Sequence, residues 1–209
     1  MPSHAIHSRP LKEPGSETTT SPRDRLDLLR YAHIFSTVVQ EVLELNTLRQ
    51  VSTESLTLSQ FHLLKLISLG GRHQVGQVAD FLGVSAPAAS KNIDKLERLG
   101  LVARRQSKGD RRATLLTPTR KGRRLVERFE TLKADRMDPV LEAFDAGEVR
   151  QLTHLLERFS ISLIDSGGVG EGLCFRCSAY FEHNCPILHY HEGCPYQKVS
   201  RGPGDQVVA

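Results

Sequence analysis

Apolar residues recur along most of the chain with the spacing of amphipathic α-helices. The segments that carry this pattern are residues 24–48, 57–69, 75–82, 85–99, 120–144 and 147–165. Ser21-Pro22 provides a start for the first segment, Ser59 an N-cap for the second, and Thr119 an N-cap for the segment that begins at residue 120. The sequence therefore predicts a mainly α-helical protein.

A helix-turn-helix is predicted in the middle of the chain. Gly83 separates segment 75–82 from segment 85–99, and Gly100 ends the second of these helices. Pro87 is tolerated in the first turn of that helix, where Ser85 can act as the N-cap. A tight glycine-containing turn between two short helices is the arrangement that many DNA-binding proteins use.

The two faces of segment 85–99 differ in chemistry. Ala89, Ile93 and Leu96 fall on one face, and we expect them to pack inward. Polar side chains that can reach phosphates or base edges lie elsewhere on the helix: Ser90, Lys91, Asn92 and Lys95. The segment is therefore a candidate recognition helix, and Ser85 at its start joins the candidate DNA contacts.

A β-hairpin is predicted directly after this helix. Residues 101–105 form one strand, Lys108-Gly109-Asp110 a turn, and residues 113–117 the returning strand. Pro118 lies at the end of a strand, where its missing N–H is tolerated. The hairpin would be a wing, and its candidate DNA contacts are Arg104, Arg105, Lys108, Asp110, Arg111 and Arg112.

Basic residues are concentrated around this hairpin. Between Lys91 and Arg124 twelve basic residues oppose three acidic ones, so this segment carries +9 while the whole chain carries +4. Such a distribution is expected of a protein that presents one face to a polyanion. A solvated basic surface is the alternative, but the adjacent helix-turn-helix favours double-stranded DNA as the partner.

Neither a membrane span nor an enzyme motif is evident in the sequence. No apolar run approaches the roughly 18 residues that a bilayer span needs. Residues 1–21 lack the apolar stretch of a secretory signal and are expected to form a disordered tail, so we expect a cytoplasmic protein. No Ser-His-Asp order, phosphate-binding loop, His-Glu-x-x-His motif or dinucleotide fingerprint occurs, and we therefore do not expect an enzyme.

All four cysteines lie in a C-terminal segment, residues 173–209, which follows a glycine-rich joint at residues 166–172. Their spacing is Cys174-x2-Cys177-x7-Cys185-x8-Cys194. Four thiolates suit zinc or an iron–sulfur cluster, and in a cytosolic chain metal binding or redox chemistry is favoured over disulfide staples. Proline follows the last two cysteines, as it does in some iron–sulfur sites, which slightly favours a cluster.

Other readings of this tail stay open. A zinc ion could staple the segment without sensing anything, and a thiol–disulfide switch is a third possibility. Histidines in the same segment could replace a cysteine as ligand, although such residues are more often found on the surface. These histidines are His183, His189 and His191.

Several segments resemble the MarR family of bacterial regulators. The similarity rests on Leu56–Phe61, Leu96–Val102, Asp110–Arg112 and Thr119–Gly122, and it covers about residues 24 to 165. The resemblance implies a mainly α-helical fold with a small β-wing, a winged helix-turn-helix domain and a helical dimerisation region. The expected organisation is a winged helix-turn-helix at residues 57–118, with dimerisation helices at residues 22–48 and 119–165.

The resemblance also implies how the protein would meet DNA. Two copies would form a homodimer on a pseudo-palindromic operator, each placing the helix 85–99 in a major groove and its wing near the adjacent minor groove. In the family the wing motif acts as a pair, so Asp110 would orient Arg112 toward the DNA. The chain would then be a transcriptional regulator, and we expect a repressor.

Two hypotheses for its regulation follow. In the first, an iron–sulfur cluster or other metal held by the four cysteines controls operator affinity and senses redox state, oxygen or iron. In the alternative, a small aromatic or acyl effector binds a cleft near Tyr31, His33, Phe35 and His62, and the tail holds a purely structural zinc. Substitution of the cysteines would separate these hypotheses, because it would leave the second response intact.

Overall fold

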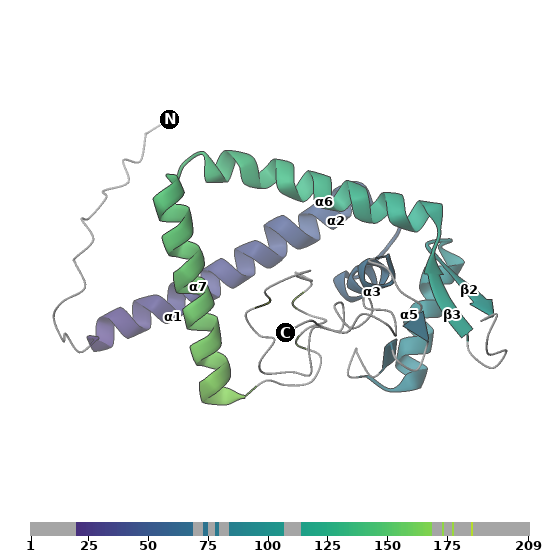
Figure 1. Cartoon of the computed structure of the whole chain (residues 1–209), viewed down its shortest axis with the longest axis horizontal. Coiled ribbons are helices and arrows are strands. Elements are labelled where there is room, and N and C mark those ends of the chain that lie inside the picture. Colours follow the sequence, from purple (N-terminus) through teal and green to yellow (C-terminus); the bar gives the residue numbers. More distant parts are fainter. Residues whose placement is uncertain are drawn as a thin grey trace, which may run out of the picture. The chain divides into compact units, whose positions relative to one another are not determined.

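The computed structural model describes residues 20–68, 73–74, 78–79, 84–106 and 114–168, together with residues 173, 177 and 185. The chain divides into two compact units, residues 1–39 and residues 40–209. The described elements are, in chain order, α1 (Pro22–Val38), the π-helix η1 (Val39–Leu45), α2 (Asn46–Val51), α3 (Leu58–Ser68), β1 (His73–Gln74), α5 (Ala86–Arg98), β2 (Val102–Gln106), β3 (Thr114–Pro118), α6 (Arg120–Leu141) and α7 (Ala146–Gly167) (Figure 1).

Helix α1 forms the described part of the first unit. Ser21 caps it by accepting a hydrogen bond from the Asp24 backbone N–H, and Pro22 occupies the first turn, as the Ser-Pro start predicts. No residue of α1 is buried, although its sequence is rich in leucine. Tyr31 is 70% exposed and Phe35 is 50% exposed. The helix therefore presents exposed apolar side chains.

The predicted helix 24–48 is longer than expected and is not α-helical throughout. Helical structure runs from Pro22 to Val51, with the π-helix η1 between α1 and α2. Over so short a segment, π-helical geometry leaves the apolar spacing almost unchanged, so periodicity does not reveal it. The far end of this helix is anchored, because Thr47, Leu48 and Val51 of α2 are buried.

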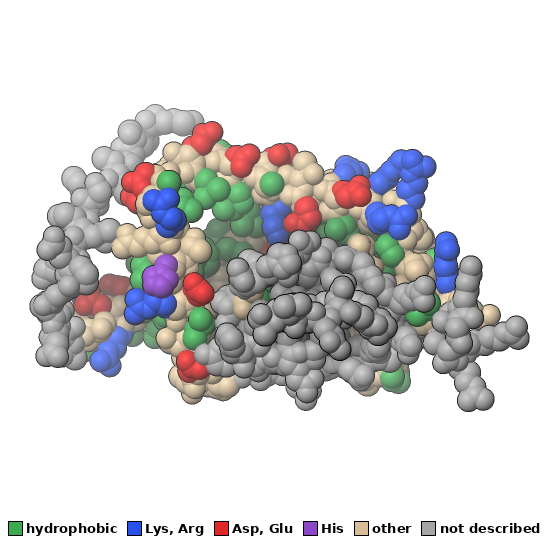
Figure 2. Space-filling view, in the orientation of Figure 1, with side chains coloured by type: hydrophobic (Ala, Val, Ile, Leu, Met, Phe, Trp, Pro, Cys, Tyr) green, Lys and Arg blue, Asp and Glu red, His purple; other side chains and the backbone are tan. Residues whose placement is uncertain are grey.

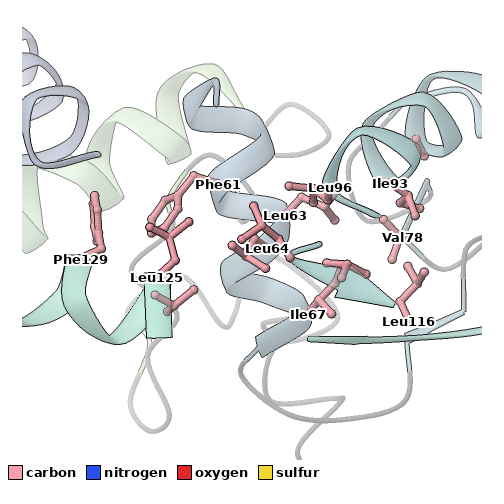
Figure 3. Close-up of a cluster of buried hydrophobic side chains, with 14 of the residues drawn as sticks. Phe61, Leu63, Leu64, Ile67, Val78, Ile93, Leu96, Leu116, Leu125 and Phe129 are labelled. Carbon is pink, nitrogen blue, oxygen red and sulfur yellow. The ribbon is translucent and has the colours of Figure 1, made fainter. Parts of the chain in front are cut away.

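The core of the second unit lies between α3, α5, α6 and the strand β3. Figure 3 shows Phe61, Leu64, Ile93 and Leu116 converging from these elements, and each of the four is 0% exposed. The rings of Phe61 and Phe129 pack with their centroids 4.3 Å apart, which fastens α3 to α6. Helix α6 begins beside the strands and then passes α3 and α2 (Figure 1).

The strands form a small antiparallel sheet in the order β1-β3-β2. Strands β2 and β3 pair from Val102↔Pro118 to Gln106↔Thr114, so the predicted hairpin is confirmed. Pro118 is the last residue of β3, where the sequence placed it. The strand β1 was not predicted, since two residues are too few to show an alternating pattern.

The helix starts are capped as predicted, with one exception. Ser85 caps α5 and Thr119 caps α6, each by accepting a hydrogen bond from a first-turn N–H. The prediction for Ser59 is wrong: Thr57 Oγ1 accepts from the Gln60 N–H, and Gln60 Oε1 accepts in return from the Thr57 N–H, both at 3.2 Å. This reciprocal capping box was present in the sequence as Thr-x-x-Gln, and it starts the helix two residues earlier.

A close approach at Gly122 fixes the start of α6 against the helix-turn-helix. A Cβ atom at this position would lie 2.2 Å from the carbonyl oxygen of Leu101 and 3.1 Å from the Leu64 side chain. Thr119 Oγ1 also donates to the Gly100 carbonyl at 2.6 Å. The helix α6 therefore holds the turn between α5 and β2 directly.

Helix α7 ends the well-described part of the chain. Asp145 and Glu148 form a capping box at its start, and Gly168 follows its end with φ +72°. No residue of α7 is buried. Among the described residues, no helix is long and apolar enough to cross a membrane.

Candidate nucleic-acid interface

Helix α5 packs its apolar side into the core and presents a polar surface on the other side. Ala89, Ile93 and Leu96 are each 0% exposed and pack into the core, as predicted. Lys91 is exposed on the helix, and Ser90, Asn92 and Lys95 are partly exposed. The last turn is followed by Gly100, whose φ of +68° lets the chain turn into β2. The polar side chains of the helix therefore lie at the surface.

One flank of α5 is tied to α3 by a polar contact at Asn92, in the middle of the helix. Gln60 Nε2 donates to Asn92 Oδ1 at 3.3 Å. Gln60 is 9% exposed and also completes the capping box with Thr57. Asn92 was predicted as a DNA contact, and the structure places it at the flank of α5 that meets α3. Gln60 was not predicted as part of the site.

The other flank of α5 is tied to the wing by Arg104. Its guanidinium forms ion pairs with Asp94 and, at 2.8 Å, with Glu97 Oε2. The Arg104 side chain is 31% exposed. The structure therefore places this predicted DNA contact against two carboxylates of α5. Asp94 and Glu97 were not predicted as site residues, although their spacing of three residues puts both on one side of the helix.

Arg105 lies on the opposite face of β2 from Arg104, since successive strand residues point to opposite faces. Arg105 is exposed, and a hollow beside it is also lined by Thr117, Arg120 and Arg123. The Arg123 guanidinium donates to the Pro118 carbonyl at 2.9 Å, which holds it at the base of the wing. Sequence reasoning missed Arg120 and Arg123 as site residues.

Positive charge is gathered at this end of the second unit. Figure 2 shows Lys and Arg side chains near the strands and the start of α6, and Asp and Glu side chains farther along α6. The first turns of α6 contain Arg120, Lys121, Arg123 and Arg124 and no acidic residue. Cations at a helix N-terminus oppose the helix dipole, so this arrangement costs stability, by about 0.3 kcal/mol or more for each charge near the first turn. The cost is consistent with a surface selected to bind an anion.

Lys121 is an exception within this group. Its Nζ contacts Glu54 Oε1 at 2.5 Å and donates to the Leu99 carbonyl at 3.0 Å. The residue therefore joins the loop before α3 to the end of α5. We assign it a structural role in holding the candidate interface together.

The remaining wing predictions lie outside the described residues. They are Lys108, Asp110, Arg111 and Arg112. Both strands that lead to this segment are described, and their register brings Gln106 opposite Thr114. The predicted pairing of Asp110 with Arg112 stays a prediction.

The predicted metal ligands are only partly described. Cys177 is exposed and Cys185 is buried, while Cys174, Cys194 and the three tail histidines lie outside the described residues. Within the described part of the chain, no group of three or more His, Cys, Asp and Glu residues is placed to hold a metal ion. The metal centre therefore stays a prediction from the spacing of the cysteines.

A buried polar seam joins the end of the first long helix to α3 and α6. His62 Nε2 lies 3.1 Å from Glu44 Oε2, and Lys133 Nζ lies 3.3 Å from Glu44 Oε1. Burial raises the pKa of Glu44, but the hydrogen bond from His62 and the charge of Lys133 outweigh burial and lower that pKa from 4.5 to about 2. Lys65 Nζ lies 2.7 Å from Glu130 Oε1 in the same seam.

His62 was predicted to lie near an effector cleft together with Tyr31, His33 and Phe35. The structure places His62 in the buried seam, 8% exposed, and the other three on exposed positions of α1. The cleft stays a prediction. None of the charged residues of the seam other than His62 was predicted to have a role.

Comparison with known proteins identifies the class of fold. The family model described as MarR family matches residues 56–114 of this chain. This range contains α3, α5, β2, the first residue of β3 and the capping box at Thr57.

Solved structures agree with this match over a longer range. YusO from Bacillus subtilis superposes with a TM-score of 0.57 at 20% identity, covering 68% of this chain and 98% of that one. A MarR family protein from Bacillus stearothermophilus gives a TM-score of 0.56 at 20% identity and covers 69% of this chain and 99% of the other. Streptococcus pneumoniae FabT, solved in complex with DNA, gives 0.56 at 23% identity over 68% and 99% of the two chains.

These matches define the fold as the MarR type of winged helix-turn-helix, mainly α-helical with a small antiparallel wing. The predicted fold class is confirmed. These structures are covered almost completely, whereas about a third of this chain lies outside the superposed part. The match therefore says nothing about the cysteine-rich segment 173–209.

Proposed function

We propose that this protein is a MarR-type transcription regulator that binds double-stranded DNA through α5 and the wing. The observation that carries the proposal is the division of α5: Ala89, Ile93 and Leu96 are fully buried in the core, while Lys91 is exposed. Further basic residues, Arg105, Arg120 and Arg123, line a hollow at the base of the wing. Basic side chains on a preformed helix can contact phosphates, and polar ones can contact base edges. The fold match to FabT, a protein solved with DNA, supports the same partner.

The test is the selection of bound sequences from a random duplex library by the full-length chain. We expect enrichment of a two-fold symmetric sequence, since two copies of one helix would read two similar half-sites. Lys91→Ala and Arg105→Ala should each weaken binding to the selected duplex by roughly fivefold or more, the effect of about one lost charged contact. Arg150→Ala on α7 is the matched control, because Arg150 is exposed and lies away from the proposed interface.

We further propose that the regulator acts as a homodimer. Apolar residues of α1 and α7 are exposed to an extent that is unusual in a lone folded chain, including Leu28 at 51%, Ile34 at 56% and Leu163 at 54%. A second copy of this chain is the simplest partner, because two copies of a DNA-reading helix match a two-fold symmetric site. Sedimentation of the full-length chain should give twice the mass of one chain, and Leu155→Glu combined with Leu163→Glu should shift it to one.

The regulatory signal is the finer part of the proposal. We propose that Cys174, Cys177, Cys185 and Cys194 hold an iron–sulfur cluster, with zinc as the alternative, and that its state alters operator affinity. The support is the chemistry of four thiols within a short segment that the fold itself does not require. Such a group would supply a redox-sensitive or metal-sensitive link, whereas the residues of α5 and the wing would still make the DNA contacts.

Anaerobic purification followed by a visible spectrum and by iron, sulfide and zinc analysis tests this part. A colourless protein with one zinc per chain would eliminate the cluster, and a protein without metal would eliminate both. A metal-independent response to a small aromatic or acyl compound that survives Cys174→Ala and Cys177→Ala would favour an effector site. None of these outcomes touches the proposal that the chain binds DNA.

A further inference from the structure

The polar contact between α3 and α5 has a fixed direction. The Thr57 backbone N–H donates to Gln60 Oε1 at 3.2 Å. A backbone N–H is always a donor, so the oxygen of the Gln60 amide must face Thr57 and its nitrogen must face the other way. Gln60 Nε2 then donates to Asn92 Oδ1 at 3.3 Å. The Thr57 N–H thus fixes the orientation of the Gln60 amide, and the Gln60 amide in turn fixes the orientation of the Asn92 amide.

Gln60 is well suited to keep this orientation. Gln60 is only 9% exposed, and its backbone N–H donates to Thr57 Oγ1 at 3.2 Å. Turning its amide over would put its NH2 group against the Thr57 N–H and its oxygen against Asn92 Oδ1, so that a donor would face a donor and an acceptor would face an acceptor. An unsatisfied buried donor costs more than a hydrogen bond gains, so a single orientation is favoured.

The consequence for Asn92 is chemical. Its Oδ1 atom is drawn toward α3 by Gln60, which leaves the Nδ2 group, a donor of two hydrogen bonds, as the end of the amide directed away from Gln60. Asn92 is partly exposed, one residue beyond Lys91 on the polar side of α5. An approaching base edge would therefore meet a hydrogen-bond donor at this position.

Bases differ in what they offer to such a donor. In the major groove guanine and thymine present only acceptors, adenine presents both an acceptor (N7) and a donor (N6), and cytosine presents only a donor (N4). We propose that Gln60 is a positioning residue that fixes Asn92 as a donor, and that Asn92 thereby disfavours cytosine, which offers it no acceptor, at one position of each half-site. The inference rests on the proposed DNA-binding function and adds to it the chemistry of one base contact.

Gln60→Glu should reverse the orientation of the Asn92 amide while hardly changing the shape of the side chain at position 60. A carboxylate can only accept hydrogen bonds, so it would accept from the Thr57 N–H and also from Asn92 Nδ2. The Asn92 amide would then turn its oxygen away from α3, and the disfavoured bases should change from cytosine to guanine and thymine, which offer no donor. Ser59→Glu is the matched control, because it adds the same charge on the same turn at an exposed position. The hydrogen bond to Asn92 comes from Gln60, so this control leaves it in place.

The experiment is selection from a random duplex library, with full-length wild-type protein, Gln60→Glu, Ser59→Glu and Asn92→Ala compared at one salt concentration. We expect the wild type and Ser59→Glu to disfavour cytosine at one position by about fivefold, the effect of one hydrogen bond. Asn92→Ala should lose this discrimination at that position alone, and Gln60→Glu should accept cytosine there and disfavour guanine and thymine. Gln60→Leu, which removes the hydrogen bond to Asn92 without adding a charge, should accept all four bases if the charged variant does not fold.

Several results would overturn the inference while leaving the proposed function intact. If Gln60→Glu still disfavours cytosine at that position, Gln60 does not orient Asn92. If Asn92→Ala lowers the affinity for all sequences equally, Asn92 contacts the DNA backbone and reads no base. If the wild type enriches no duplex at all, the proposed DNA-binding function itself has failed.

Discussion

Helices α5 and α7 are both amphipathic, yet the structure treats their apolar sides in opposite ways. On α5 the apolar residues Ile93 and Leu96 are 0% exposed, packed against α3 and the sheet. On α7 Leu152, Leu155 and Leu163 are between 48% and 54% exposed. The same kind of pattern in the sequence therefore has two outcomes: on α5 it marks the core of the chain, and on α7 it marks an exposed apolar surface, which we propose as part of the dimer interface.

The glycines of the two long C-terminal helices give the sharpest contrast. Gly122→Ala should destabilise the fold by about 4 kcal/mol, because its Cβ would collide with the Leu101 carbonyl, a backbone atom that cannot move aside cheaply. Gly167→Ala at the end of α7 meets nothing within 4 Å and should change stability by less than about 1 kcal/mol. Chemical denaturation of both variants measures the difference, and equal effects would mean that α6 does not press against the turn at Leu101.

Truncation of one leucine in each region separates folding from association. Leu96→Ala removes a side chain that is 0% exposed, and we expect a loss of about 3 kcal/mol in the free energy of unfolding. Leu155→Ala removes one that is 49% exposed, so it should leave the unfolding of the isolated chain almost unchanged and weaken self-association. Denaturation and sedimentation equilibrium are needed together. A Leu155→Ala chain that unfolds as easily as Leu96→Ala would show that α7 is covered within its own chain.

Acid should distinguish the buried seam from the exposed carboxylates of α7. The pKa of Glu44 is about 2 in the folded protein, below its ordinary value of 4.5. In that interval the unfolded state binds more protons, so stability falls as the pH falls from about 4.5 to about 2, by up to about 3 kcal/mol. Glu44→Gln should remove most of this slope, whereas Glu157→Gln on α7 should retain it. An unchanged slope in Glu44→Gln would contradict the assignment.

Substitution of the two neighbouring arginines of β2 should have two different effects, one on DNA binding and the other on stability. Arg105→Ala should lower DNA affinity and reduce the dependence of log K on log salt by about one unit, as expected for one lost phosphate contact, without altering stability. Arg104→Ala should cost up to about 1 kcal/mol of stability, since it breaks partly exposed ion pairs to Asp94 and Glu97. Fluorescence anisotropy at several salt concentrations and denaturation distinguish them. A full loss of salt dependence in Arg104→Ala alone would assign the phosphate contact to that residue.

The sequence predicted the fold where local chemistry decides it. The caps at Ser85 and Thr119, the stop at Gly100 and the hairpin of β2 and β3 were all confirmed, because each depends on residues close together in the chain. The N-cap of α3 was placed two residues too late, at Ser59 instead of Thr57, although the Thr-x-x-Gln pattern of the capping box is present in the sequence.

The candidate site was harder to predict because its contacts join distant segments. Gln60 and Asn92 are 32 residues apart, and Lys133 reaches Glu44 across 89. No periodicity or motif indicates such pairs. Arg104 and Arg105 are neighbouring residues of the same type, so the sequence does not distinguish them. They differ because they lie on opposite faces of β2: Arg104 forms an ion pair with α5, whereas Arg105 is exposed beside Arg120.

The account depends above all on α5 and the wing binding duplex DNA as one half of a pair. Hydroxyl-radical footprinting of the full-length protein on the duplex enriched from the random library tests this directly. The account predicts two protected patches related by two-fold symmetry, with centres about one helical turn apart. A single protected patch, or no protection at a salt concentration that preserves other specific complexes, would contradict it.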